Sequence, residues 1–484
     1  MVLGSSFLMR WLFLVALAAS VFAAFHLVYT QGRQDPIFAS YLRSHDISAQ
    51  FILQIVFIRK SRFSHNPKLG LRNKMKNDSV AEQSFSLMKI KPTITTQSLP
   101  ESEHEYSVQI FYYPWYGNPK FDKKYYHWNH NYLPHWNPEV SRKYTKGFHV
   151  PPSDIGSNFY PLLGPYSSRD PNVIEQHMKW MSSAGVDVVV VSWYPPRIAD
   201  EQGHSWDDLM PVLLDAVGKY RMKLSFHMEP YKNRNGSSIR ADIEYIIDNY
   251  GSHSALFKMK QPKQRKNVNK SEQKGELFEV KNLPVLYFYD SYLVPSAEWK
   301  ALTTQNGKFS VRGGKYDILF IGLLVKSEDR HTLLKAGFDG IYTYFATEGF
   351  SYGSTPSNWP SLSSFCRKNN LLFVPSVGPG YDDRRVRPWN EKNLRNRENG
   401  KYYAEMFEMA HIARANIVTI TSFNEWHEGT QIEPAIPFTD NGTGFVYSTY
   451  AQGPEQYLHE TLDHVKKYFT PLDKIAPEKI VSVV

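Results

Sequence analysis

The sequence predicts an α/β protein, a (β/α)8 TIM barrel preceded by an N-terminal transmembrane helix and a stem. Three features predict it: β-branched and aromatic runs alternate with helical segments, polar side chains follow those runs, and an apolar segment lies near the start. The chain has 484 residues, 42% hydrophobic and 21% charged. This composition is that of a globular protein with a buried core, not of a disordered chain.

The apolar segment covers residues 11–29 and is long enough to cross about 30 Å of hydrocarbon. A cleaved signal peptide is the alternative, because residues 18–24 include the small side chains that cleavage sites use. The apolar run continues beyond them, so we expect a short cytoplasmic tail at 1–10, a transmembrane signal-anchor at 11–29 and a largely unstructured lumenal stem at 30–104. A lumenal body fits the four N-glycosylation sequons, at Asn77, Asn235, Asn269 and Asn441.

The barrel is predicted at residues 105–473, followed by a C-terminal tail at 474–484. Its eight strands are predicted at 108–113, 186–193, 223–227, 285–289, 318–325, 340–345, 371–377 and 417–423. The helices that follow them are predicted at 171–184, 205–220, 238–250, 296–304, 327–336, 357–369, 402–415 and 453–468. An open doubly wound sheet is the alternative, but the chain has no glycine fingerprint for a nucleotide at a switch point.

Polar aromatic and acidic side chains gather where the predicted strands end. In a barrel these ends face the active site. The candidates there are Tyr113, Trp115, Trp193, Glu229, Asp290, Tyr344, Arg387, Glu425, Trp426 and Glu428. We expect Glu229 and Asp290 to contact substrate because of their strand positions alone.

Glu425 and Glu428 lie three positions apart just after the last predicted strand. Two carboxyl groups on one side of a turn suit glycoside hydrolysis, in which one acts as an acid and the other as a base or nucleophile. Aromatic neighbours such as Trp426 provide the apolar wall that raises a carboxyl pKa. Solvated surface charge is the alternative interpretation, and the strand-end position argues against it.

Other chemistries have weaker support. His127, His130 and His135 have the side chains of metal ligands, but their spacing is not diagnostic, and loop structure or sugar contacts are the preferred interpretation. Cys366 is the single cysteine, which excludes an internal disulfide; we expect a core residue there and not a catalytic thiol. The formal charge is +9, and the basic stretch 258–274 is predicted to be an exposed loop and not a nucleic-acid site.

Six segments resemble glycoside hydrolase family 99, and the resemblance covers nearly all of residues 108–468. They are FYYPWYG at 111–117, YHWNH at 126–130, SWYPP at 192–196, GIYTYFA at 340–346, PSVGPGY at 375–381 and TSFNEWHEGT at 421–430. The last motif is the most specific of the six.

The resemblance implies a (β/α)8 Golgi type II membrane enzyme, held by residues 11–29, that needs no metal or other cofactor. It implies retaining, endo-acting cleavage of α-1,2-mannosidic bonds in glucosylated high-mannose N-glycans, with release of glucosyl-α-1,3-mannose through a 1,2-anhydro sugar. By resemblance, Glu425 deprotonates the mannose 2-hydroxyl and Glu428 is the acid/base. The expected substrate-binding residues are Tyr113, Trp115, Trp193, Tyr344, Arg387 and Trp426, together with Glu229 and Asp290.

Two other functions remain open at this point. A catalytically silent, lectin-like glycan-binding protein could use the same barrel, although it would have no need of both acids. A type II glycosyltransferase would share the anchor and stem, but it would need a nucleotide-sugar site that the predicted barrel lacks.

Overall fold

The structure is a computed structural model that describes residues 107–260 and 282–469. The predicted cytoplasmic tail, signal-anchor, stem and C-terminal tail lie outside these ranges, as do Asn77 and Asn269. Within the two described ranges, no helix is both long and apolar enough to cross a bilayer.

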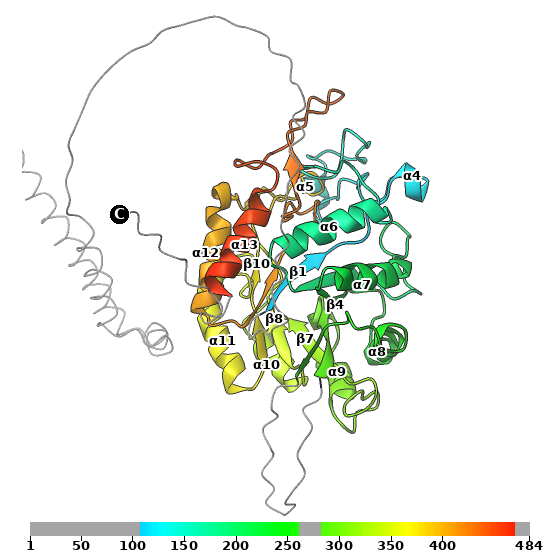
Figure 1. The fold of residues 1–484 in the computed structure, drawn as a ribbon, viewed down its shortest axis with the longest axis vertical. Coiled ribbons are helices and arrows are strands. Elements are labelled where there is room, and N and C mark those ends of the chain that lie inside the picture. Colours follow the sequence, from blue (N-terminus) through cyan, green and yellow to red (C-terminus); the bar gives the residue numbers. More distant parts are fainter. Residues whose placement is uncertain (1–106, 261–281, 470–484) are drawn as a thin grey trace, which may run out of the picture. The chain divides into compact units, whose positions relative to one another are not determined.

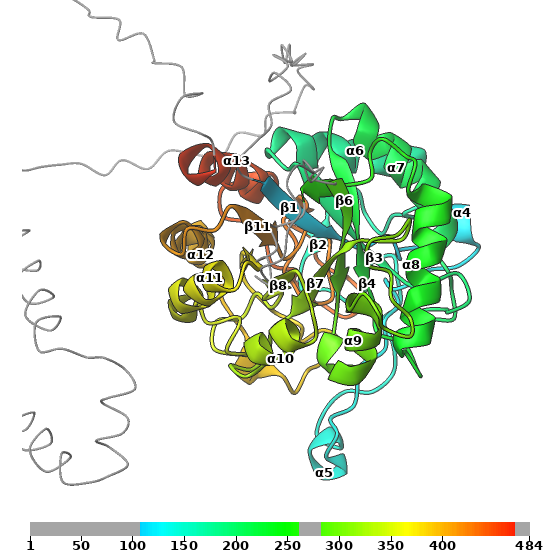
Figure 2. The ribbon, with the colours of Figure 1, turned by 90° about the horizontal axis from the view of Figure 1, so that it is seen from below.

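A parallel sheet closes into a barrel at the centre of the described residues (Figure 2). Its strands are β1 (Ser107–Tyr112), β3 (Val188–Trp193), β4 (Lys223–Met228), β6 (Asn282–Phe288), β7 (Leu319–Leu323), β8 (Gly340–Tyr342), β9 (Leu372–Val374), β10 (Ser376–Val377) and β11 (Ile417–Ile420). The strand order is β10-β11-β1-β3-β4-β6-β7-β8-β9. Because β9 and β10 are two halves of one predicted strand, this order returns to its start, and the predicted barrel is confirmed.

Helices surround the barrel and follow its strands in turn (Figure 1). They are α6 (Pro171–Ser183), α7 (Met210–Lys219), α8 (Gly236–Tyr250), α9 (Ser296–Thr303), α10 (Asp329–Lys335), α11 (Trp359–Lys368), α12 (Lys401–Ile412) and α13 (Gln456–Tyr468). Each coincides with a predicted helix to within a few residues. Two short helices, α4 (Pro119–Asp122) and α5 (Pro138–Ser141), lie outside this ring.

The strands form where the sequence is continuously apolar, because both faces of a barrel strand are covered. In β3, for example, all six residues are buried. The barrel interior is unusually polar and aromatic: the hydroxyl of Tyr287 donates to Gln109 at 2.8 Å, and that of Tyr342 lies 2.8 Å from Nε2 of His227. The ring of Phe111 packs edge-on against Tyr344 with centroids 5.2 Å apart. The packed side chains of the barrel interior therefore extend to the carboxyl ends of the strands.

Several predicted strands are shorter in the structure, among them β3, β7 and β11, and in two further strands a backbone feature explains the difference. The strand predicted at 340–345 ends at Tyr342, because Tyr344 has a left-handed backbone with φ of 54° that no strand residue adopts. The strand predicted at 371–377 is interrupted at Pro375, which has no N–H to donate to the ladder.

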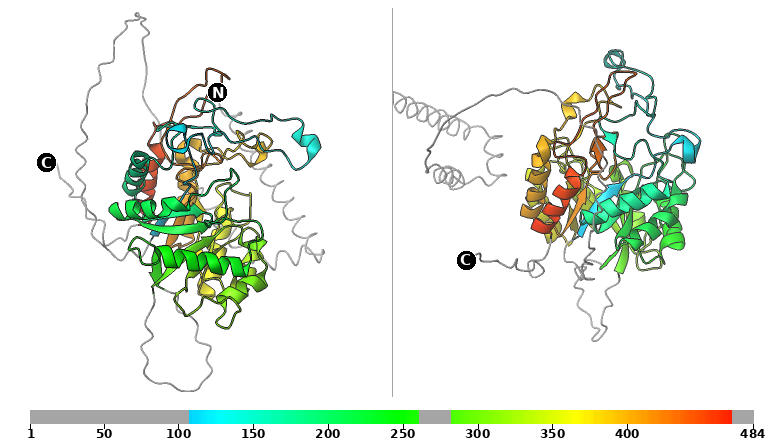
Figure 3. Two further views of the ribbon diagram at one scale, coloured as in Figure 1. Left: turned by 90° about the vertical axis from the view of Figure 1, so that its right-hand side faces the viewer. Right: turned by 45° about the horizontal axis from the view of Figure 1, so that its top comes forward.

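Long loops cover the carboxyl end of the barrel (Figure 3). The segment between β1 and α6 contains β2 (Tyr160–Pro161), which pairs antiparallel with β12 (Ala435–Ile436) from the segment after β11. This pairing ties together two loops that are far apart in sequence. At the start of the basic stretch 258–274, the prediction of a loop is wrong: β5 (Lys258–Lys260) pairs antiparallel with β6.

Candidate active site

The loop that follows β11 carries both candidate catalytic glutamates and is tied to the end of β1. The Asn424 side chain accepts from the Tyr113 N–H at 2.8 Å and donates to the Tyr113 carbonyl at 2.9 Å. The Tyr116 hydroxyl donates to the Asn424 carbonyl at 3.0 Å and accepts from the Trp426 N–H at 3.1 Å. These bonds fix the turn that carries the glutamates, so their side chains are held before substrate arrives.

The two carboxyl groups are withdrawn from water and interact with each other. Glu425 is 4% exposed, and Glu428 is partly buried. Burial is the main cause that raises the pKa of each group above its ordinary value, and the charge of Glu425 raises the pKa of Glu428 further. The pair therefore holds a proton at a pH where isolated carboxyl groups are ionised, which is the state that an acid and a base acting together require.

Tyr113 and Tyr344 are brought together beside the glutamates, as predicted. Their hydroxyls share a hydrogen bond, and both side chains are buried. Burial and the nearby carboxylates raise the pKa of both tyrosines well above the ordinary value. Both therefore remain neutral, with hydroxyl groups that can donate to a substrate oxygen or to a carboxylate.

Arg387 acts electrostatically on the pair and is held by Asp383. Its Nη1 is 3.0 Å from Oδ2 of Asp383, which also accepts from the Tyr381 hydroxyl at 2.8 Å and the Asn390 side chain at 2.9 Å. The guanidinium lowers the pKa of both catalytic glutamates against the effect of burial. Arg387 therefore lies within electrostatic reach of both glutamates, and its expected contact with substrate stays a prediction.

Trp115 and Trp193 line a narrow crevice together with Tyr194. Trp115 is partly exposed; its ring stacks on His127 with centroids 4.8 Å apart and lies 4.7 Å from that of Tyr113. Trp193 is 2% exposed and donates its indole N–H to Asp207 at 2.7 Å. Trp115 therefore keeps part of its ring exposed at the edge of the crevice, whereas Trp193 is buried in its wall.

Glu229 and Asp290 extend the site toward β4 and β6. Glu229 accepts from the Ser192 hydroxyl at 2.8 Å, and its charge raises the pKa of Tyr113 and of Glu428. Burial raises the pKa of Asp290, and the Glu229 charge raises it further. Both acids therefore lie within electrostatic reach of the site, and their contact with substrate stays a prediction.

The prediction that Trp426 contacts substrate is wrong. Its side chain has no exposed surface, and its indole N–H donates to Glu433 at 3.0 Å. The turn after β11 directs this ring into the core beneath the two glutamates. Trp426 therefore supports the loop from below.

Some residues of the site were not among the predicted side chains. Burial is the main cause that raises the pKa values of Tyr289 and Tyr381, and the charge of nearby Glu428 raises both further. Each lies at the end of a predicted strand, which is the signal that could have identified them. Glu433 left no such signal, because it follows the motif and its partners are far away in sequence.

The three candidate histidines differ in their surroundings: the rings of His127 and His130 pack against His427 beside Glu425, whereas His135 packs elsewhere. Nε2 of His127 lies 3.0 Å from Asp200, and Nδ1 of His130 lies 2.8 Å from the Asn131 carbonyl. The ring of His135 packs on Trp136, with centroids 3.7 Å apart. Across residues 107–260 and 282–469, no three His, Cys, Asp or Glu side chains are grouped so that they could hold a metal ion.

Cys366 is completely buried on α11, where burial raises its pKa to about 12, as expected for a core thiol. Of the sequons in the described residues, Asn441 is exposed in a loop. Asn235 is exposed at the start of α8, where its side chain accepts from the Ser238 N–H at 3.0 Å.

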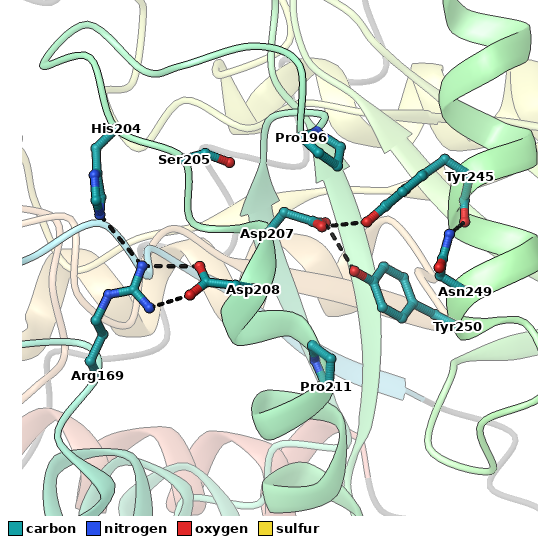
Figure 4. Close-up of a pocket in the computed structure, with 10 residues that line it drawn as sticks. All are labelled: Arg169, Pro196, His204, Ser205, Asp207, Asp208, Pro211, Tyr245, Asn249 and Tyr250. Carbon is teal, nitrogen blue, oxygen red and sulfur yellow. Dashed lines mark hydrogen bonds and ion pairs between the residues drawn. The ribbon is translucent and has the colours of Figure 1, made fainter.

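A hollow of about 690 Å³ lies behind the crevice wall, at the start of α7 and against α8 (Figure 4). Asp207 is at its centre and accepts from Tyr245 at 2.6 Å and Tyr250 at 3.0 Å, in addition to Trp193. None of the residues that line this hollow is a predicted site residue. The acid pair, and not this hollow, is the candidate active site.

A parallel barrel with a buried and a partly buried carboxyl group among aromatic side chains at its strand ends is the architecture of a glycoside hydrolase. The comparisons with known proteins agree. The family model of glycosyl hydrolase family 99 matches residues 103–470. The chain belongs to this family and is a glycoside hydrolase.

Several relatives cover most of the chain. It is 50% identical over 364 residues to glycoprotein endo-alpha-1,2-mannosidase of Rattus norvegicus, a match that covers 75% of each chain. It is 47% identical over 399 residues to a glycoprotein endo-alpha-1,2-mannosidase-like protein of Danio rerio, covering 82% of this chain and 86% of that one. The solved GH99 endo-alpha-mannosidase from Bacteroides thetaiotaomicron is 39% identical and has a TM-score of 0.64, covering 75% of this chain and 97% of that chain.

Proposed function

We propose that this chain is a retaining, endo-acting α-1,2-mannosidase that cleaves glucosylated high-mannose N-glycans and releases glucosyl-α-1,3-mannose. The observation that supports the proposal most strongly is the buried pair Glu425 and Glu428, whose pKa values are both raised mainly by burial. The names of the relatives support the same bond specificity. The aromatic lining formed by Tyr113 and Trp115 fits a sugar substrate.

In the first step, Glu425 takes the proton of the mannose 2-hydroxyl, and the 2-oxygen attacks the anomeric carbon. The bond to the leaving oxygen breaks, and Glu428 gives that oxygen its proton. A 1,2-anhydro sugar is formed, and no enzyme atom becomes covalently bound to it. Arg387 holds a positive charge beside both glutamates while Glu425 takes up one proton and Glu428 gives up another.

In the second step, Glu428 takes a proton from water, and the water oxygen attacks the anomeric carbon. The bond from that carbon to the 2-oxygen breaks, and Glu425 returns its proton to the 2-oxygen. Each step inverts the anomeric carbon, so the product keeps the configuration of the substrate. Both glutamates end in their starting protonation states, so the cycle balances.

We further propose that the enzyme is a single-pass type II protein of the Golgi membrane, held by residues 11–29, with its barrel in the lumen. The apolar character of that segment supports the anchor, and the four sequons support a lumenal barrel. No cofactor enters either step.

The experiment is to incubate the full-length chain, in detergent and with a chelator, with a monoglucosylated high-mannose N-glycan and to weigh the products by mass spectrometry. The proposal predicts that a glucose-mannose disaccharide leaves as one unit. Loss of single hexoses would contradict endo cleavage. An unchanged glycan that copurifies with the chain would favour the lectin-like alternative.

Matched variants assign the activity to the pair. Glu425→Gln and Glu428→Gln should each retain glycan binding and lose hydrolysis. Glu405→Gln makes the same chemical change at an exposed position of α12 and should leave hydrolysis unchanged. Turnover retained by either of the first two variants would overturn the assignment of that residue.

A further inference from the structure

His427 lies between the two glutamates in sequence and has a polar neighbour at each ring nitrogen. Nε2 is 2.9 Å from the carbonyl oxygen of His127, and Nδ1 is 3.3 Å from Oε1 of Glu425. The residue is 7% exposed, so water offers little competition for these contacts. Since a peptide carbonyl can only accept, the hydrogen of a neutral His427 ring lies on Nε2, and Nδ1 carries a free lone pair.

A second proton on this ring is disfavoured by its surroundings. Burial is the main cause that lowers the pKa of His427, to about 3, and the neighbouring His127 and Arg387 lower it further. The ring of His130 also packs against it, with centroids 4.6 Å apart. At neutral pH the ring therefore faces Glu425 with an unprotonated nitrogen.

This arrangement distinguishes the two states of Glu425. When the carboxylate is charged, its oxygen and the Nδ1 lone pair face each other without a proton between them. When Glu425 carries a proton, it can donate an O–H···N hydrogen bond to Nδ1 of His427. The distance between these two atoms is then expected to shorten. We propose that His427 is a positioning residue whose free Nδ1 receives the hydrogen bond of Glu425 once Glu425 has taken the proton from the mannose 2-hydroxyl.

The proposal rests on the proposed function and gives it a further part, a residue that strengthens the base. Glu425 alone would be a weak base for a sugar hydroxyl, and an acceptor that favours its protonated form increases its proton affinity. The backbone N–H of His427 donates to the same oxygen at 3.1 Å and acts in the opposite direction, because it favours the carboxylate. The side chain and the backbone of one residue thus hold the Glu425 oxygen in place in both states.

The carbonyl that fixes the His427 tautomer is itself anchored. His127 has a left-handed backbone with φ of 61°, and its Nε2 lies 3.0 Å from Oδ2 of Asp200. The same Asp200 oxygen accepts from the indole N–H of Trp206 at 2.8 Å, and the other oxygen accepts from the His204 N–H at 2.9 Å. A loop remote in sequence therefore determines which nitrogen of His427 faces the base.

Other charged and titratable groups also interact electrostatically with Glu425. All of them are present in the variants described next. They are Glu428, Glu201, His127, Arg387, Tyr113, Tyr116 and Tyr344. The groups that act on His427 itself are Glu425, His127, His130, His149 and Arg387. A comparison of substitutions at position 427 holds this background constant.

Two substitutions separate the two ring nitrogens. His427→Asn places an amide oxygen near the position of Nδ1 and loses the donor to His127. His427→Gln reaches the His127 carbonyl with its amide N–H and leaves no acceptor beside Glu425. We expect the acid limb of the kcat/KM profile to move to lower pH by about one unit in His427→Gln and to stay near its wild-type position in His427→Asn.

In His427→Gln, kcat should also fall at the pH optimum by about tenfold with KM nearly unchanged, because the lost interaction is made only after proton transfer. His459→Gln, the same change at an exposed position of α13, should leave the profile unchanged. An acid limb that does not move in His427→Gln, or that moves equally in both variants at position 427, would overturn the proposal.

The ring nitrogens can also be observed directly in the wild-type chain, whether or not either variant folds. In protein labelled with 15N-histidine, the His427 resonances should show a proton on Nε2 and a free Nδ1 near neutral pH. A proton on Nδ1, or on both nitrogens, would overturn the proposal. If the wild-type chain does not cleave the glycan, the proposed function fails, and this measurement still reports the tautomer.

Discussion

His177 and Glu433 form a buried pair, with Nε2 of His177 lying 3.1 Å from Oε1 of Glu433, and neither residue has exposed surface. The other oxygen of Glu433 accepts from the Tyr166 hydroxyl at 2.8 Å and from the Trp426 indole N–H at 3.0 Å. The pair therefore joins α6 to the loop that carries the catalytic glutamates. A buried carboxyl group has no water to replace a lost partner, so the contact matters for both stability and loop position.

Replacing His177 by Ala should lower the free energy of unfolding by about 3 kcal/mol, because it removes packing and leaves one Glu433 oxygen without its partner. Chemical denaturation of the purified full-length chain measures this change. His459→Ala, at an exposed position of α13, should change the same quantity by less than about 0.5 kcal/mol. Equal stability of the two variants would show that the buried pair contributes nothing.

Tyr344→Phe should reduce kcat/KM by about tenfold or more, because it leaves the buried Tyr113 hydroxyl without its partner beside the glutamates. Steady-state hydrolysis of the glycan measures the effect. Tyr403→Phe is a matched control: its hydroxyl lies 3.0 Å from that of Thr461 between α12 and α13. If both variants lost activity equally, the effect would be one of stability and not of the site.

Replacing Glu428 by Gln should stabilise the fold increasingly as pH rises. Burial raises the pKa of Glu428 above its ordinary value of 4.5 in the folded chain. The unfolded chain releases this proton first, so its ionisation favours unfolding from that pH upward, until the folded group also titrates. A glutamine cannot ionise, so the variant does not lose this part of its folding stability as pH rises.

Thermal unfolding at two pH values measures this difference. At about pH 4 the variant and the wild type should unfold at nearly the same temperature, whereas at about pH 8 the variant should unfold at least about 2 °C higher. The exposed Glu405→Gln should show no such dependence on pH. A Glu428→Gln variant that is less stable at high pH would mean that the carboxylate is stabilised in the fold.

Substitutions of Trp115 and Trp426 should have different effects, the first on substrate binding and the second on stability. Trp115→Ala removes a partly exposed ring from the crevice and should raise KM by about tenfold with a smaller effect on kcat. Trp426→Phe removes the indole N–H that Glu433 accepts and should instead cost about 1–3 kcal/mol of stability. An increased KM for Trp426→Phe with unchanged stability would restore it as a substrate contact.

Most of the fold could be predicted from the sequence because its strands and helices are periodic and alternate along the chain. The errors arise where backbone geometry departs from that period. Tyr344 looks like a strand residue but takes a left-handed conformation, and Pro375 divides an otherwise continuous apolar run. Neither the φ of one residue nor a local break in pairing is visible in an apolar pattern.

The candidate site was predictable to the extent that its residues follow strands. Glu425, Glu428, Tyr113 and Tyr344 lie together because barrel strands end at one rim. The sequence could not show which way Trp426 turns, because a turn has no side-chain period. Glu433 was missed for a different reason: its partner His177 is 256 positions away, and only the folded chain brings them together.

Glu425 is assigned as the base and Glu428 as the acid. Substrates with two different leaving groups, fluoride and the sugar of the N-glycan, distinguish these roles. Fluoride needs no proton to leave, so a glucosylmannosyl fluoride bypasses a general acid but still needs the base. We expect Glu428→Gln to release fluoride at least about one-hundredfold faster than it cleaves the N-glycan, and Glu425→Gln to be inactive on both substrates. Fluoride release restored in Glu425→Gln, or restored in neither variant, would contradict the assignment of base and acid.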